Sequence, residues 1–74
     1  MTNQSIFFNP GDAIASTHDF KEARRSAEIF KAKTKANEKL VIAQNDKNGE
    51  FAIYYADKVA DKTKGIPHHL KDKL

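Results

Sequence analysis

The sequence predicts a small α+β domain in which one helix packs on one face of an antiparallel sheet of three to four strands, in β(β)αββ order. Three observations lead to this prediction. Residues 40–57 have the composition of a β-hairpin, residues 20–37 show the apolar spacing of a helix, and residues 5–8 form a short apolar run ahead of both. With 74 residues and no cysteine, the chain has room for a single core, without disulfides or thiolate metal sites.

The amino-terminal part is expected to begin with a short strand at Ser5–Phe8. The following Asn9–Asp12 favours a type II turn, because proline suits the second position of that turn and glycine the third. Residues 13–16 either return as a second strand or stay irregular, since alanine is a poor strand former. The sequence leaves both alternatives open.

A helix is expected to begin at Phe20 and to run to about Lys35 or Asn37, because Asp19 and Glu22 have the spacing of a capping box. At about 100° per residue, one stripe of this helix faces the sheet. The stripe consists of Phe20, Ala23, Ala27, Phe30 and Thr34. Ile29 does not fit it, so either Ile29 or Phe20 packs elsewhere.

The hairpin turn is expected at Asp46–Gly49. Aspartate at the first position and glycine where φ must be positive favour a type I turn with a glycine bulge, a three-residue loop that pairs Asp46 with Glu50. With this register, one sheet face lies under the helix and carries Val41, Ala43, Phe51, Ile53 and Tyr55. The opposite face carries Leu40, Ile42, Ala52 and Tyr54 and needs a cover.

Residues 1–64 are expected to form the domain, with a helical turn or two in residues 57–64. Residues 65–74 are expected to form a basic carboxy-terminal tail, because Gly65 and Pro67 interrupt the chain and the rest is short and polar. Two interpretations of the tail stay open. It orders on a partner through its apolar residues, or it packs against its own sheet.

No catalytic pattern is evident. The three glycines do not form a phosphate-binding loop, and no serine or cysteine lies beside a plausible base. His68 and His69 lack a converging third ligand, and His18 is distant in sequence. We therefore predict no enzyme activity, no cofactor and no metal site. The amino terminus lacks a basic signal region, and no window approaches the ~20 apolar residues of a membrane span, so we expect a cytoplasmic protein without membrane contact.

The formal net charge is +3, and the basic excess is concentrated in residues 20–39 and 58–74. Such local excess favours an acidic or phosphate-bearing partner. The candidate contact residues are Arg24, Arg25, Lys31, Lys35, Lys62 and Lys64. A small basic nucleic-acid-binding protein is therefore the alternative function, against the simpler interpretation of a solvated lysine-rich surface.

In size and make-up the chain resembles the small accessory proteins of phages and mobile elements that block host machinery, including anti-CRISPR proteins. This resemblance rests on architecture rather than on a motif. It implies a non-enzymatic binding or regulatory protein that acts by steric blockade of a host protein. The predicted protein-partner surface consists of Leu40, Ile42, Tyr54 and Ile29. The uncovered sheet face is also a candidate surface for a homodimer.

Overall fold

The computed structural model describes residues 5–33, 39–61 and 63–74. Its elements in chain order are β1 (Ile6–Phe8), the 3-10 helix η1 (Pro10–Asp12), β2 (Ala15–Thr17), α1 (Phe20–Lys33), β3 (Leu40–Asn45), β4 (Phe51–Tyr55) and β5 (Ile66–Lys73). All strand pairs are antiparallel, in the order β1-β5-β3-β4-β2. The predicted α+β class is confirmed, but the described chain forms a sheet of five strands rather than three to four.

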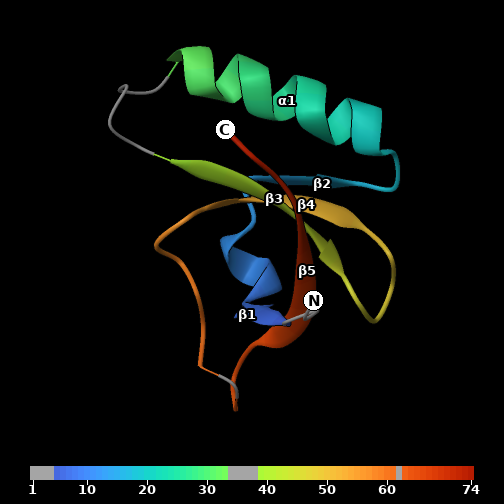
Figure 1. Cartoon of the computed structure of the whole chain (residues 1–74), viewed down its shortest axis with the longest axis vertical. Helices are drawn as coiled ribbons and strands as arrows, with labels where there is room; N and C mark the ends of the chain where they lie inside the picture. The colour runs from blue at the N-terminus through green and yellow to red at the C-terminus, as the bar shows by residue number, and fades with distance from the viewer. Residues whose placement is uncertain (1–4, 34–38, 62) are drawn as a thin grey trace.

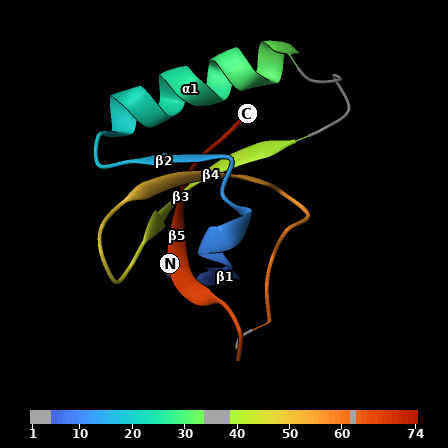
Figure 2. The same ribbon diagram turned by 180° about the vertical axis from the view of Figure 1, so that it is seen from behind.

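Both faces of the sheet are covered. Helix α1 lies on one side of β3 and β4, while β1 and η1 lie on the other (Figures 1 and 2). The cluster under the helix contains Ala23, Ala27, Leu40, Ile42 and Ile53. The cluster on the opposite face contains Phe8, Val41, Ala43, Ala52 and Tyr54. The prediction of one uncovered apolar sheet face is therefore wrong.

The turn between β3 and β4 is one residue longer than predicted. The Asn45 N–H donates to the Glu50 carbonyl oxygen at 2.8 Å, which closes a loop over residues 46–49. Gly49 adopts the predicted positive φ, 78°. The Asp46 N–H donates to the Pro67 carbonyl oxygen at 3.0 Å, so β5 draws Asp46 away from the hairpin. This long-range bond gives a physical reason for the longer loop.

The longer loop changes the register by one residue. Leu40 pairs with Tyr55, and Gln44 pairs with Phe51. Because successive strand residues point to opposite faces, this shift turns β3 over relative to the prediction. Leu40 and Ile42 therefore lie under the helix, where Val41 and Ala43 were expected. The facing of β4 was predicted correctly, since Phe51, Ile53 and Tyr55 lie on the helix side.

The segment before the helix differs from the predicted turn. Residues 10–12 form η1, in which the Asp12 N–H donates to the Asn9 carbonyl oxygen at 2.8 Å. Gly11 has no positive φ, so the type II turn is wrong. Part of the uncertain segment 13–16 does form a strand, β2, but it pairs with β4 rather than with β1.

Helix α1 begins at Phe20 as predicted. The Asp19 carboxylate accepts from the Lys21 N–H at 3.0 Å and so caps the helix. The Asp19 N–H donates to Thr17 Oγ1 at 3.3 Å, rather than to Glu22 as a capping box would require. The expected helix end at Lys35 or Asn37, and Thr34 of the stripe, lie outside the described residues.

The predicted helix stripe packs on the sheet. Ala23 and Ala27 are buried. Phe20 meets Phe51 edge-to-face with ring centroids 5.5 Å apart, and Phe30 meets Tyr55 in the same way at 6.0 Å. Ile29 is 51% exposed, so Ile29 rather than Phe20 lies outside the stripe.

The segment 66–73, predicted as part of a tail, is strand β5 and lies between β1 and β3. His68 pairs with both Ile6 and Asn45. The register of β3 and β5 shifts between Ile42 and Ala43, which marks a bulge. The described part of residues 57–64 contains no helix. It forms turns and a bridge between Val59 and Phe8. Of the two interpretations of the tail, packing against its own sheet is confirmed.

Candidate functional site

A hydrogen-bonded pair lies inside the cluster opposite the helix. The Tyr54 hydroxyl is 3.1 Å from His68 Nε2, and His68 Nδ1 is 2.7 Å from the Ile66 carbonyl oxygen. A carbonyl oxygen can only accept, so Nδ1 carries a proton, and in the neutral imidazole Nε2 then accepts from the Tyr54 O–H. All three groups are satisfied within the fold, so this chain of hydrogen bonds is structural.

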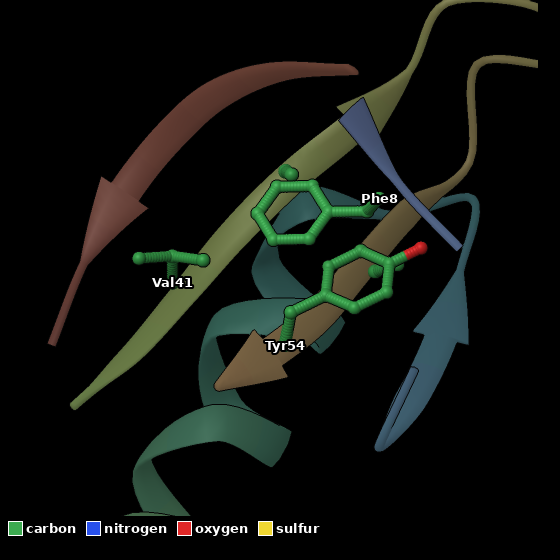
Figure 3. Packing of buried hydrophobic residues seen from close by; sticks show 5 residues of the cluster. Phe8, Val41 and Tyr54 are labelled. Atoms are coloured by element: carbon green, nitrogen blue, oxygen red, sulfur yellow. The ribbon is translucent and has the colours of Figure 1, made fainter. Parts of the chain in front are cut away.

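Aromatic stacking fixes the position of Tyr54. The rings of Phe8 and Tyr54 stack with centroids 4.2 Å apart and planes 7° apart, and Figure 3 shows them with Val41 of β3 beside them. Phe8 comes from the far edge strand of the sheet, so the sheet curls to bring β1 over β4. Burial raises the pKa of the Tyr54 hydroxyl, and the negative charges of Asp12 and Glu50 add to this effect.

An apolar groove of about 310 Å³ lies beside this cluster. It lies where the ends of β3 and β5 meet β1 and the segment after β4. Its lining residues are Ile6, Phe8, Lys39, Leu40, Val41, Ala56, Val59, Leu70, Lys73 and Leu74. We call it the β1–β5 groove. Eight of these ten side chains are apolar, and the two polar ones are lysines.

Main-chain hydrogen bonds hold the segment that forms one wall of the groove. The Ala56 N–H donates to the Lys39 carbonyl oxygen at 2.9 Å, and the Ala60 N–H donates to the Phe7 carbonyl oxygen at 2.6 Å. Between these two anchors Val59 is 57% exposed although it lines an apolar groove. An exposed valine on a backbone that is held at both ends is a preformed contact point for an apolar group.

The residues predicted to form a protein-partner surface are not brought together on the outside. Leu40 and Ile42 are 0% exposed and Tyr54 is 1% exposed. Only Ile29 lies on the surface, on the outer face of α1. Leu40 and Ile42 are buried because the register shift turns them toward the helix. Tyr54 is on the predicted face, but Phe8 covers it.

The predicted basic contact residues do not form one free basic surface either. Arg24 forms ion pairs with Glu28 at 3.3 Å and with Asp72 at 2.8 Å. Lys31 Nζ donates to the Leu74 carbonyl oxygen at 3.4 Å. The remaining candidates divide into Arg25 and Lys64, which are exposed, and Lys35 and Lys62, which lie outside the described residues.

The other two histidines lie near the hairpin turn. His69 Nδ1 is 2.6 Å from the Asp46 carboxylate, and His18 Nε2 is 3.8 Å from the Glu50 carboxylate. Across residues 5–33, 39–61 and 63–74, no three histidine or acidic side chains are grouped so that they could hold a metal ion. In the same part of the chain, no helix combines the length and apolar character that crossing a bilayer requires.

No protein-family model, curated protein or solved structure matches this chain.

The sequence did not indicate the groove residues as a site. They come from separate segments of the chain that meet only because β5 inserts between β1 and β3. The one local signal was the apolar character of Val59 and Leu70 within a polar carboxy-terminal region. It could not show which strand these residues would face.

Proposed function

We propose that the protein is a non-enzymatic binding protein that regulates a partner protein by occupying part of its surface, in the manner of the small phage and mobile-element inhibitors. The observation that carries this proposal is the β1–β5 groove, which combines apolar walls with an exposed valine and two lysines. Apolar grooves with a few polar groups at the edge are typical binding sites.

The groove can supply contact energy without a change in the fold. Its floor is formed by Phe8 and Val41, which belong to the packed core opposite the helix. Val59 lies beside this floor, and its apolar surface is removed from water when a partner fills the groove. Each 100 Å² of apolar surface removed from water contributes about 2.5 kcal/mol, before the entropic cost of association is subtracted. A single apolar side chain of a partner is therefore a useful anchor here.

Direct nucleic-acid binding remains the alternative proposal, but no specific contact among the described residues favours it. Tyr54, the aromatic residue considered for stacking on bases, is buried. Arg24 is engaged by two carboxylates. Exposed basic residues such as Arg25 and Lys64 remain for phosphate contacts.

The test is capture of partners from a cell lysate on immobilised protein, with two matched variants. Val59→Glu places a charge in the groove, and Ile29→Glu places the same charge on the outer helix surface. Both positions are more than half exposed, so both variants should fold. We expect the groove variant to lose a protein that the wild type and the helix variant retain. The purified partner should then lose its own binding or catalytic activity when the wild type is added.

Equal retention by all three proteins would contradict the role of the groove. Capture of nucleic acid instead of protein, with an affinity that falls steeply between about 50 and 200 mM salt, would support the alternative.

A further inference from the structure

We propose that the β1–β5 groove receives a short acidic-apolar segment of a partner protein, in which an aliphatic side chain fills the groove and neighbouring carboxylates meet Lys39 and Lys73. This inference rests on the proposed binding function and adds the chemistry of the segment that is bound.

The positive charge of the groove favours an acidic segment. Lys39 and Lys73 are exposed, and neither ammonium group forms an ion pair with a described residue. Among the described residues, no aspartate or glutamate side chain lines the groove. Asp72, the neighbour of Lys73 in β5, does not neutralise it, because its carboxylate is held by Arg24 at 2.8 Å. A bound segment therefore meets two lysine side chains and no acidic side chain of the lining.

The apolar lining of the groove favours aliphatic side chains in that segment. Around the buried floor, the walls are formed by the partly exposed Ile6, Leu70 and Leu74 together with Val59. A volume of about 310 Å³ is at the lower end of the range for ligand pockets. The groove therefore suits one or two aliphatic side chains of an extended segment better than a whole amphipathic helix. Carboxylates beside those side chains would then reach the lysines at the edge.

A second copy of the chain fits the groove less well. The exposed neighbours Glu28 and Ile29 on α1 could enter the groove of another molecule. Such a contact joins two different surfaces, so it closes only when a symmetric pair or ring fills every groove, and otherwise each added copy leaves another groove open. Each copy also carries a net charge of +3, and like charges disfavour the contact.

The probes are three blocked tetrapeptides, each with two leucines between two identical residues: glutamate, glutamine or lysine. They are titrated into the isotopically labelled full chain at low ionic strength, and amide shifts are followed by NMR. We expect the glutamate peptide to shift the signals of groove residues and to bind about three- to tenfold more tightly than the glutamine peptide, because each exposed ion pair adds little. The lysine peptide should bind most weakly.

Charge variants locate the selectivity. In the Lys39→Gln, Lys73→Gln double variant, the glutamate and glutamine peptides should bind equally. The control is Lys21→Gln, Lys33→Gln, which removes the same charge from exposed positions on α1 and should keep the three- to tenfold preference. Moderate salt should reduce this preference in the wild type, because exposed charge pairs are screened.

Equal binding of the three peptides, or shifts confined to residues outside the groove, would overturn the inference. Tighter binding of sodium decanoate than of the glutamate peptide would also overturn it, in favour of a fatty-acid site. Shifts that depend on protein concentration and connect Ile29 with the groove would overturn it in favour of self-association. If Val59→Glu loses a captured partner while the peptides show no preference for acid, the binding function stands and only the acidic-apolar chemistry fails.

Discussion

The Tyr54 hydroxyl donates a hydrogen bond to His68 Nε2 over 3.1 Å, and both side chains are buried. This contact connects β4 with β5, two strands that are not neighbours in the sheet. It closes the cluster opposite the helix, on which the groove depends for its floor.

Tyr54→Phe should lower the free energy of unfolding by about 1–2 kcal/mol, because His68 Nε2 loses its donor in a buried site while the stacking on Phe8 is kept. Urea denaturation measures the change. Tyr55→Phe is the control, because within the described residues its hydroxyl has no assigned hydrogen bond. It should change stability by less than about 0.5 kcal/mol. Equal effects of the two variants would show that the hydrogen bond contributes nothing.

Alkaline pH should destabilise the protein through Tyr54. Its pKa is raised in the folded protein, mainly by burial, whereas in the unfolded chain it is about 10. The unfolded state therefore releases the proton first, and this contribution to stability is complete below pH ~10 and is lost as the pH rises above it. Absorbance at the phenolate band should show a late ionisation that is missing in Tyr54→Phe. If the variant instead lacks an ionisation at or below pH ~10, the pKa of Tyr54 is not raised by the fold.

Gly65→Ala should be destabilising by about 1–3 kcal/mol, because an added Cβ would lie 2.9 Å from the Cβ atoms of Ala60 and Phe7. The close approach keeps the groove wall against β1. Gly11→Ala is the matched control, since the nearest atom to its added Cβ is 3.4 Å away and the site is exposed. Thermal unfolding of both variants tests this, and a similar melting temperature for the two would contradict the tight packing.

Ile42→Lys should unfold the protein, whereas Ile29→Lys should leave its stability within about 0.5 kcal/mol of the wild type. Ile42 is 0% exposed under the helix, and Ile29 is 51% exposed. Far-ultraviolet circular dichroism and urea denaturation measure both effects. A folded Ile42→Lys protein would support the originally predicted register, in which Ile42 faces away from the helix.

Removal of residues 65–74 should abolish cooperative unfolding, because β5 joins β1 to β3 and provides His68. Without it, β1 loses its partner strand and the cluster around Phe8 opens. The amide NMR spectrum of the truncated chain should collapse to the narrow dispersion of an unfolded protein. A truncated chain that keeps the wild-type melting temperature would show that this segment is a detachable tail.

Local sequence predicted the helix start, the helix stripe and the positive φ of Gly49, because each depends on interactions within a few residues. Asp19 caps its own helix, and a glycine at that turn position is favoured wherever the strands go. The facing of β4 also followed from its own alternation of Phe51, Ile53 and Tyr55. These features gave the α+β class.

Tertiary structure decided the register of β3 and the place of β5. Residues 40–43 are all apolar, so their sequence fits either register equally well. The hydrogen bond from Asp46 to Pro67 favours the register that is observed. The polar segment 66–73 has no strong strand pattern of its own and becomes a strand through long-range pairing with β1 and β3. The groove is formed by these long-range pairings, and no single stretch of sequence could have indicated it.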